Sequence, residues 1–284
     1  DLDAFAYGDA RDVRILDDGD GLAFALIGML PARRTLLPAI YGMLTLQNGV
    51  PTGYSQVDVL GGSAAISFNT FPTFRGGETA HAFARLLAAV RHVLGATSFS
   101  IEPYQLGKGN DEGIETGAWW FYHKMGFRPR STTARRIART ELARIKANPR
   151  HRSSPATLRR LADWHLFFEL DPAHSRGLPP VAALGARVAT QLARYPAPDR
   201  AGALDEAGRT LMRRAGLRSL RGFTPAERLA WRRWSPFVLA LPGLSRWSAA
   251  DWRAAARVVR AKGGRRESDF AALFEPMARM AAAG

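Results

Sequence analysis

Residues 117–129 read Gly-Ala-Trp-Trp-Phe-Tyr-His-Lys-Met-Gly-Phe-Arg-Pro. An aromatic helical segment runs up to Gly126, a residue type that suits the backbone at the end of a helix. Phe127 then begins a short extended segment. Aromatic residues on a helix mostly face a core, so we expect Trp119 and Phe121 to be buried. The stretch predicts the last helix-to-strand step of a small α/β unit.

Three predicted strands precede this step and form a meander. Residues 40–47 are apolar and β-prone, and Asn48-Gly49 is a strong hairpin-turn signal. Residues 53–60 are the predicted return strand, and Gly61-Gly62 make a second turn. In the third strand, residues 64–71, apolar and polar positions alternate. The pattern is typical of antiparallel strands.

A turn rich in arginine and glycine follows the meander. Residues 74–79 read Phe-Arg-Gly-Gly-Glu-Thr and lead into a predicted helix over 80–94, which Gly95 ends. The N–H groups of a first helical turn attract anions, and glycine lets a ligand approach the backbone. This order predicts a phosphate-binding turn, with a plain strand-to-helix turn as the alternative. Residues 97–102 are a fourth predicted strand, followed by a glycine-rich loop over 107–117.

The first thirty residues carry weaker signals. Residues 12–16 form a candidate strand, and residues 17–21 read Asp-Asp-Gly-Asp-Gly. No glutamate follows at the bidentate position of a calcium loop, so we interpret this run as a turn. Residues 22–30 are the longest apolar stretch, well short of the roughly 20 residues that span a bilayer. We interpret them as buried core.

The second half of the chain is predicted to be helical. Ser154-Pro155 and the capping box over 224–227 are helix-start signals. Tryptophans at positions 164, 231, 234, 247 and 252 are expected to anchor a bundle core. The predicted helices span residues 132–147, 155–170, 180–195, 203–220, 225–240, 249–262 and 268–282.

Charge is divided unevenly along the chain. Residues 1–130 hold 11 Lys and Arg against 13 Asp and Glu, whereas residues 131–284 hold 29 against 12, and the whole chain carries +15. This break predicts an α/β domain over 1–130 and a basic all-helical domain over 131–284. A basic half indicates an acidic partner, which is nucleic acid, a membrane surface or an acidic protein. The alternative is that arginine only coats solvated helix faces.

Two groups of arginines recur at helical spacing. Such stripes bind phosphate backbones in nucleic-acid-binding proteins. No aromatic residues are interleaved for base stacking, which favours a solvated face over nucleic acid. The first group contains Arg253, Arg257 and Arg260, and the second contains Arg213, Arg214, Arg218 and Arg221.

Other features narrow the class of protein. The chain has no cysteine, which excludes disulfides and thiolate chemistry and fits a cytoplasmic protein. Its six histidines show no metal-ligand spacing, so no metal site is expected. The chain opens on Asp1 without a basic signal region, and the missing initiator Met leads us to expect a further N-terminal piece.

The order of these elements resembles the GNAT superfamily of N-acyltransferases over residues 40–130. The run 121–127 is similar to the family's Tyr-x-Lys-x-Gly-Phe type ending, and the hairpin over 48–54 is similar to the family's second and third strands. The resemblance implies an α/β fold: a GNAT-like mixed sheet flanked by helices. An all-α helical bundle domain would follow it in this chain.

The resemblance further implies direct acyl transfer from acetyl-CoA or another acyl-CoA to an amine. Tyr122 would protonate the departing thiolate, and a backbone N–H near residues 69–71 would stabilise the oxyanion. Glu102 or Asp58, each at or near a strand end, would help to deprotonate the amine. The donor would bind at Asn69, Thr70, Phe71, Arg75, Gly76, Gly77, Thr79 and Ala80.

Two positions depart from the family pattern. Glu78 stands where the family's pyrophosphate turn has a glycine, and a carboxylate there would repel a pyrophosphate. This suggests an acyl donor on an acidic carrier protein, docked by the basic half. Glu115 stands where the family often has asparagine, while Asn110 lies in an apparent insertion. The alternative function is a catalytically inactive GNAT-like binding module for nucleic acid or an acidic protein.

Overall fold

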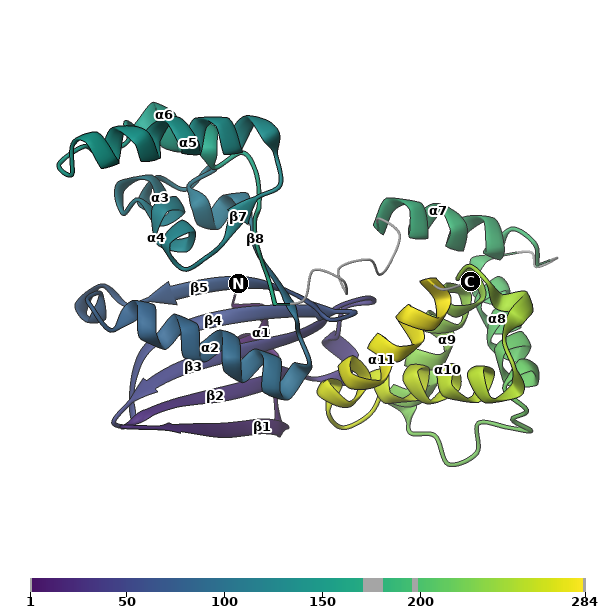
Figure 1. The fold of residues 1–284 in the computed structure, drawn as a ribbon. Helices are drawn as coiled ribbons and strands as arrows, with labels where there is room; N and C mark the ends of the chain where they lie inside the picture. Colours follow the sequence, from purple (N-terminus) through teal and green to yellow (C-terminus); the bar gives the residue numbers. More distant parts are fainter. Residues whose placement is uncertain (1, 171–180, 196–198, 283–284) are drawn as a thin grey trace.

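The computed structural model describes residues 2–170, 181–195 and 199–282. An eight-stranded mixed sheet forms the centre, in the order β1-β2-β3-β4-β5-β6-β8-β7 (Figure 1). Helices α3 to α6, which lie within residues 111–161, gather above β5, and helices α7 to α11, which lie within residues 181–282, gather beyond one end of the strands. The fold is therefore α/β with a mostly helical C-terminal part.

Five strands, not three, make up the antiparallel meander. They are β1 (Gly8–Gly19), β2 (Leu22–Met29), β3 (Ala39–Gln47), β4 (Val50–Leu60) and β5 (Ser63–Thr70). The stretch interpreted only as buried core is β2, most of whose residues are buried on both faces of the sheet. A strand covered on both sides lacks the alternation of apolar and polar residues that reveals a strand in a sequence.

The phosphate-type turn joins β5 to a helix as predicted. A short 3-10 turn, η2 (Pro72–Phe74), leads to α2 (Thr79–Leu94), and Gly95 ends the helix with a left-handed backbone (φ 71°). Helix α2 packs its apolar side on the face of the sheet that carries Phe68, whose ring lies 5.0 Å from that of Phe83. Strand β6 (Ser98–Ile101) then runs parallel to β5.

Between β6 and the final strands, short helices build one wall of a cleft. They are η3 (Pro103–Leu106), α3 (Asp111–Glu115) and α4 (Ala118–Lys124). Strand β7 (Arg128–Pro129) has only two residues, in agreement with the brief final strand expected from the sequence. Helices α5 (Thr132–Ala147) and α6 (Pro155–Leu161) follow it.

Strand β8 (Leu166–Glu169) contradicts the helix predicted over 155–170. It inserts between β6 and β7 and pairs antiparallel with both. The boundary predicted at residue 130 thus falls inside the sheet, between β7 and β8. The wrong helix prediction extended the pattern of Leu158 and Leu161 past the end of α6, which Ala162 caps.

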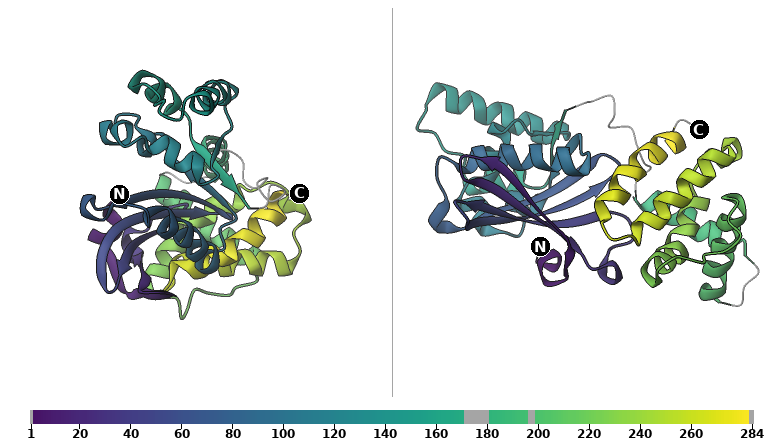
Figure 2. Two further views of the ribbon diagram at one scale, coloured as in Figure 1. Left: turned by 60° about the vertical axis from the view of Figure 1, so that its left-hand side comes forward. Right: turned by 90° about the horizontal axis from the view of Figure 1, so that it is seen from below.

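The C-terminal part contains helices only, among the residues described there. Trp234 is fully buried and packs edge-on against Phe270 and Phe274 at 5.0 and 5.5 Å. Figure 2 shows these helices as a group set against one end of the sheet. They are α7 (Val181–Leu192), α8 (Arg200–Arg214), α9 (Pro225–Leu239), α10 (Ala249–Lys262) and α11 (Glu267–Ala282).

A buried polar network joins these helices to the sheet. The guanidinium of Arg34, from the loop after β2, donates to the carbonyl oxygens of Lys262 (3.0 Å), Gly264 (2.6 Å) and Arg265 (3.0 Å). Lys262 pairs with Glu267 at 2.5 Å, and both side chains are almost completely buried. The two parts of the molecule therefore share one interior.

Over residues 2–170, 181–195 and 199–282, we find no helix with the length and apolar character needed to cross a membrane.

Candidate functional site

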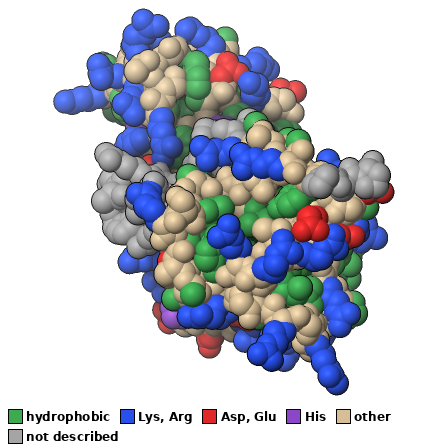
Figure 3. Space-filling view, turned by 90° about the vertical axis from the view of Figure 1, so that its right-hand side faces the viewer, with side chains coloured by type: hydrophobic (Ala, Val, Ile, Leu, Met, Phe, Trp, Pro, Cys, Tyr) green, Lys and Arg blue, Asp and Glu red, His purple; other side chains and the backbone are tan. Residues whose placement is uncertain are grey.

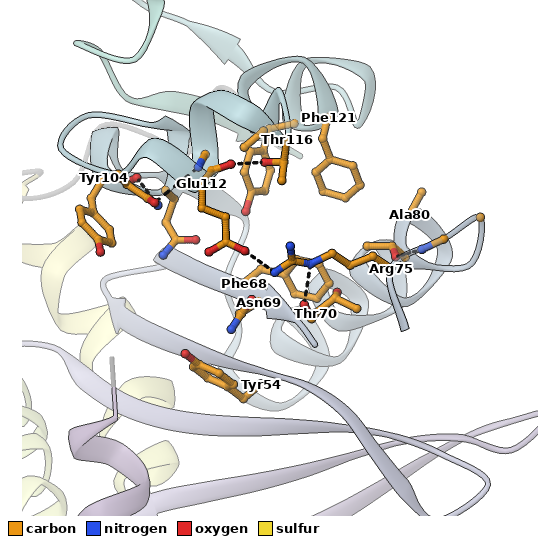
Figure 4. A pocket seen from close by; sticks show the side chains of 18 residues that line it. Tyr54, Phe68, Asn69, Thr70, Arg75, Ala80, Tyr104, Glu112, Thr116 and Phe121 are labelled. Carbon is orange, nitrogen blue, oxygen red and sulfur yellow. Dashed lines mark hydrogen bonds and ion pairs between the residues drawn. The ribbon is translucent and has the colours of Figure 1, made fainter. Parts of the chain in front are cut away.

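The sheet opens between β5 and β6. Only three residue pairs join these parallel strands, from Ser63 with Ser98 to Ala65 with Ser100. Strand β5 then continues for five residues, to Thr70, and no strand in the described ranges pairs with it on that side. A cleft of about 630 Å³ lies at this opening, between β5 and the short helices α3 and α4 (Figure 4).

Most residues predicted to bind the donor line this cleft. Strand β5 contributes its C-terminal end, and the following turn contributes its glycines and the start of α2. Tyr122 reaches the same cleft from α4, on the opposite wall. The predicted donor-binding residues that line the cleft are Asn69, Thr70, Arg75, Gly76, Gly77, Thr79 and Ala80.

The backbone of β5 presents hydrogen-bonding groups to the cleft, but not all those that were expected. Phe71 donates its N–H to the carbonyl oxygen of Thr52 on β4 (2.9 Å) and does not line the cleft. Along an antiparallel strand the direction of these groups alternates, so the N–H of Asn69 also faces β4. Those of Phe68 and Thr70 face the opening. Of the residues 69–71, which were expected to supply the oxyanion donor, only Thr70 therefore turns its N–H toward the opening. The N–H of Phe68, outside that range, faces the opening as well.

Tyr122 is 97% covered by its neighbours but still borders the cleft. Its ring packs against Phe83 (5.4 Å), Phe121 (5.2 Å) and Phe127 (6.0 Å). Within the described part of the chain, its hydroxyl has no hydrogen-bond partner, and burial raises the pKa of the phenol above its usual range. The group therefore stays protonated at neutral pH.

The prediction for the neighbouring aromatic residues is half right. Trp119 is completely buried, as expected. Phe121 is only partly buried and lines the cleft, where its ring stacks parallel to Phe68 at 6.4 Å. Phe68 and Phe121 come from opposite walls, so they make a hydrophobic contact across the cleft.

Arg75 is held by two partners at the side of the cleft. Its Nε donates to the carbonyl oxygen of Thr70 at 3.0 Å, and its Nη2 donates to Oε1 of Glu112 on α3 at 2.5 Å. Figure 4 shows the resulting bridge between the turn after β5 and the helix on the opposite wall. The guanidinium that was expected to meet a phosphate thus already has a carboxylate partner.

Glu78 lies elsewhere. It precedes α2, is exposed, and lines a second hollow of about 330 Å³ together with Phe74, His81 and Asn48. It is absent from the lining of the main cleft. The repulsion expected between Glu78 and a phosphate in the cleft is therefore not supported by its position.

The two carboxylates predicted to deprotonate the amine do not line the cleft. Asp58 is partly buried on β4 and accepts a hydrogen bond from Nε2 of Gln56 at 3.0 Å. Burial raises its pKa, and the negative charge of Glu102 adds to this effect although the Gln56 hydrogen bond opposes it. Glu102 is exposed at the end of β6. Strand-end position alone does not indicate whether a side chain turns toward a cleft.

Sequence reasoning missed several polar residues of the cleft. The cleft lining includes Tyr54 on β4, Tyr104 in η3, Glu112 on α3 and Thr116 at the end of α3. Asn110, noted as part of an insertion, lines it as well and caps α3 by accepting from the N–H of Gly113 at 3.4 Å. The cap motif before α3 was the one available signal that this loop contains a helix facing the opening.

Comparison with family models, with curated proteins and with solved structures found no match for this chain. Among the described residues, no group of three or more His, Asp and Glu side chains is placed to hold a metal ion. The arrangement provides a cleft that reaches a strand edge, two inward backbone N–H groups and one buried phenol. These groups suit a ligand with an extended arm and a reacting carbonyl group.

Proposed function

We propose that this chain is an acyltransferase that moves an acyl group from a thioester of the pantetheine type to an amine. The observation that supports this most is the parting of β5 from β6 after Ala65 and Ser100, with the cleft at that place. An extended amide-containing arm can pair with an unpaired strand edge as an additional strand does. The resemblance of residues 40–130 to the GNAT superfamily predicts the same arrangement.

Each chemical step has a candidate group in the cleft. The amine nitrogen attacks the carbonyl carbon of the thioester, and the N–H groups of Phe68 and Thr70 stabilise the negative oxygen that forms. The carbon–sulfur bond then breaks, and the phenol of Tyr122 gives its proton to the departing sulfur. The attacking amine loses a proton, which restores the phenol. Asp58 and Glu102 have no part in these steps, because they lie outside the cleft lining.

The test is thiol release with defined donors. The protein is incubated with acetyl-pantetheine or acetyl-CoA and a panel of primary amines, and free thiol is followed with a chromogenic reagent. Tyr122→Phe removes the proton donor and keeps the ring, so kcat should fall by about a hundredfold. Tyr7→Phe, outside the cleft, is the control and should leave kcat unchanged. No thiol release with any amine, and no rise in Tm with either donor, would contradict the proposal.

A second candidate function follows from the basic surface of the helices. Many exposed Lys and Arg side chains cover the C-terminal helices and the α5–α6 region (Figure 3). The chain would then be a binding module for nucleic acid or an acidic protein, with a cleft that performs no chemistry. Binding of generic duplex DNA with a steep salt dependence, together with no response to any thioester, would favour this function.

A further inference from the structure

The charges that line the cleft cancel each other. Among the described lining residues, Arg75 is the only Lys or Arg and Glu112 the only Asp or Glu. The two are joined at 2.5 Å, so no cation of the lining is left to balance an incoming anion. A ligand with several phosphates would have to break this pair and would then meet the carboxylate of Glu112.

Coenzyme A and a carrier protein present the same pantetheine arm with different charges. Coenzyme A ends in a pyrophosphate and a ribose phosphate, whereas the arm of a carrier protein ends in a single phosphodiester. The neutral lining suits the second form better. The N–H groups at the start of α2 can accommodate one phosphate, although Gly76 already donates its N–H to Oγ1 of Thr79 at 3.3 Å.

A strongly basic surface adjoins the wall that carries Glu112. Residues 131–165 hold nine Lys and Arg against two Asp and Glu, and one of those carboxylates, Glu141, is buried. Arg159 of α6 lies 3.5 Å from Asp111, the neighbour of Glu112 on α3. Figure 1 shows α5 and α6 directly above α3 and α4, so this basic surface and the cleft wall belong to one group of helices.

The exposed face of α5 also has an apolar element. Arg135, Arg139, Leu142 and Lys146 follow one another at spacings of four and three residues, which places them along one side of the helix. Leu142 is 42% exposed among these cations. A mixture of cations and one apolar side chain suits an acidic protein helix better than a nucleic-acid backbone.

We propose that the acyl donor is carried by an acidic carrier protein, which docks on α5 and α6 and passes its pantetheine arm into the cleft. This inference rests on the proposed acyltransferase function and specifies its donor. The Arg75–Glu112 pair disfavours coenzyme A, and the charge of the α5–α6 surface attracts the carrier.

Binding of three donors to the full chain tests the proposal. The donors are acetyl-pantetheine, acetyl-CoA, and an acyl carrier protein of the fatty-acid type loaded with acetyl-phosphopantetheine. We expect the loaded carrier to bind at least about tenfold more tightly than acetyl-CoA, and to lose that advantage in high salt. Titration calorimetry measures each Kd.

Charge reversal identifies the docking surface. Arg139→Glu with Lys146→Glu reverses two exposed charges on this side of α5 and should weaken carrier binding by about tenfold or more without altering acetyl-pantetheine binding. Arg253→Glu with Arg257→Glu, on the exposed face of α10, makes the same change in net charge. This matched control should have little effect.

The outcomes separate the inference from the function on which it rests. Acetyl-CoA binding as tightly as the carrier, or carrier binding unaffected by the α5 reversal, overturns the carrier proposal and leaves the acyltransferase standing. Failure of all three donors to bind overturns both. A labelled DNA duplex that binds and is released by the α5 reversal, while the carrier does not bind, assigns this surface to nucleic acid instead.

Discussion

Single residues that line this cleft also take part in the packing of the core. Tyr122 belongs to the hydrophobic core through Phe83 and Phe127, yet it borders the opening. Phe121, one position earlier, contacts Phe68 across the cleft. Because neighbouring residues on a helix point about 100° apart, one short helix can place one ring in the core and the next at its edge.

Glu112 is expected to weaken the binding of highly charged donors. Glu112→Gln removes the negative charge, keeps the size of the side chain, and releases the full charge of Arg75 for a phosphate. We predict that acetyl-CoA binds about five- to tenfold more tightly to this variant at low salt. Glu115→Gln, an exposed position of the same helix outside the cleft, is the control. Equal Kd values for wild type and Glu112→Gln would contradict the role given to this carboxylate.

The pKa of His123 leads us to expect that the free energy of unfolding depends on pH. Its ring stacks on the ring of Trp119 at 5.1 Å. Burial is the main cause that lowers its pKa to about 4, and the positive charge of Arg128 adds to this effect. In the unfolded chain a histidine titrates near pH 6.5, so between about pH 6.5 and pH 4 the unfolded state binds more protons than the folded state. This term makes the free energy of unfolding fall as the pH drops through that window.

The variant His123→Gln isolates this effect. It should flatten the decline in the free energy of unfolding between those pH values, as measured by urea denaturation at a series of pH values. His92→Gln, at an exposed position on α2, should retain the wild-type slope. An unchanged slope in His123→Gln would show that this histidine does not contribute.

At the scale of elements, the close approach of β4 to β5 sets up the cleft edge. Gly53 lies opposite Thr70, and a Cβ added at Gly53 would lie 2.4 Å from the carbonyl oxygen of Asn69. No real Cβ tolerates such a distance to a backbone atom, so the strands would have to move apart. The pairing that turns the N–H of Thr70 toward the cleft thus depends on a glycine in the neighbouring strand.

Two glycine substitutions with opposite outcomes test this dependence. Gly53→Ala should lower the free energy of unfolding by about 1–3 kcal/mol, as overpacking does. Gly185→Ala, in helix α7 with no atom near the added Cβ, should raise it by about 0.5–1 kcal/mol because alanine favours a helix. Chemical denaturation measures both, and a neutral Gly53→Ala would mean that the strands adapt easily.

At the scale of the whole molecule, buried charged side chains connect the C-terminal helices to the sheet. Tyr41 donates to Oδ2 of Asp12 at 2.8 Å, and the same oxygen accepts the N–H of Glu267 at 3.1 Å, so β1, β3 and α11 meet at one carboxylate. Burial lowers the pKa of Lys262 and raises that of Glu267, and each charge offsets part of this effect on the other. The pair fixes the helices on the sheet.

Breaking this pair should be costly. Lys262→Met removes the 2.5 Å partner of the buried Glu267 and leaves it only the more distant guanidinium of Arg34, at 3.8 Å, so we predict a loss of about 3–5 kcal/mol in the free energy of unfolding. The double variant Lys262→Met with Glu267→Gln should lose less, because neither charge of the Lys262–Glu267 pair then stays buried without the other. Arg209→Met, which breaks the exposed pair with Glu206, is the control and should cost at most about 1 kcal/mol. Equal losses for the buried and exposed pairs would contradict this account.

Local patterns in the sequence were sufficient for much of the fold. The helices over 132–147 and 249–262 were predicted with the bounds that the structure has, because cap residues and apolar spacing act within a few turns. The turn at Asn48-Gly49 and the glycine that ends α2 follow from backbone preferences of single residues. Tyr122 was expected beside a cleft, and it lines one.

Contacts between distant parts of the chain decided the features of the fold and the cleft that local patterns did not predict. Strand β8 is a strand because β6 and β7 offer it edges to pair with, and its four residues carry no such information by themselves. Glu112 meets Arg75 across 37 positions, and Asp12 meets Glu267 across 255. A sequence determines local preference directly, since the interacting groups are neighbours in the chain. Which charges and strand edges meet is decided only when the elements pack, because it depends on their positions in space.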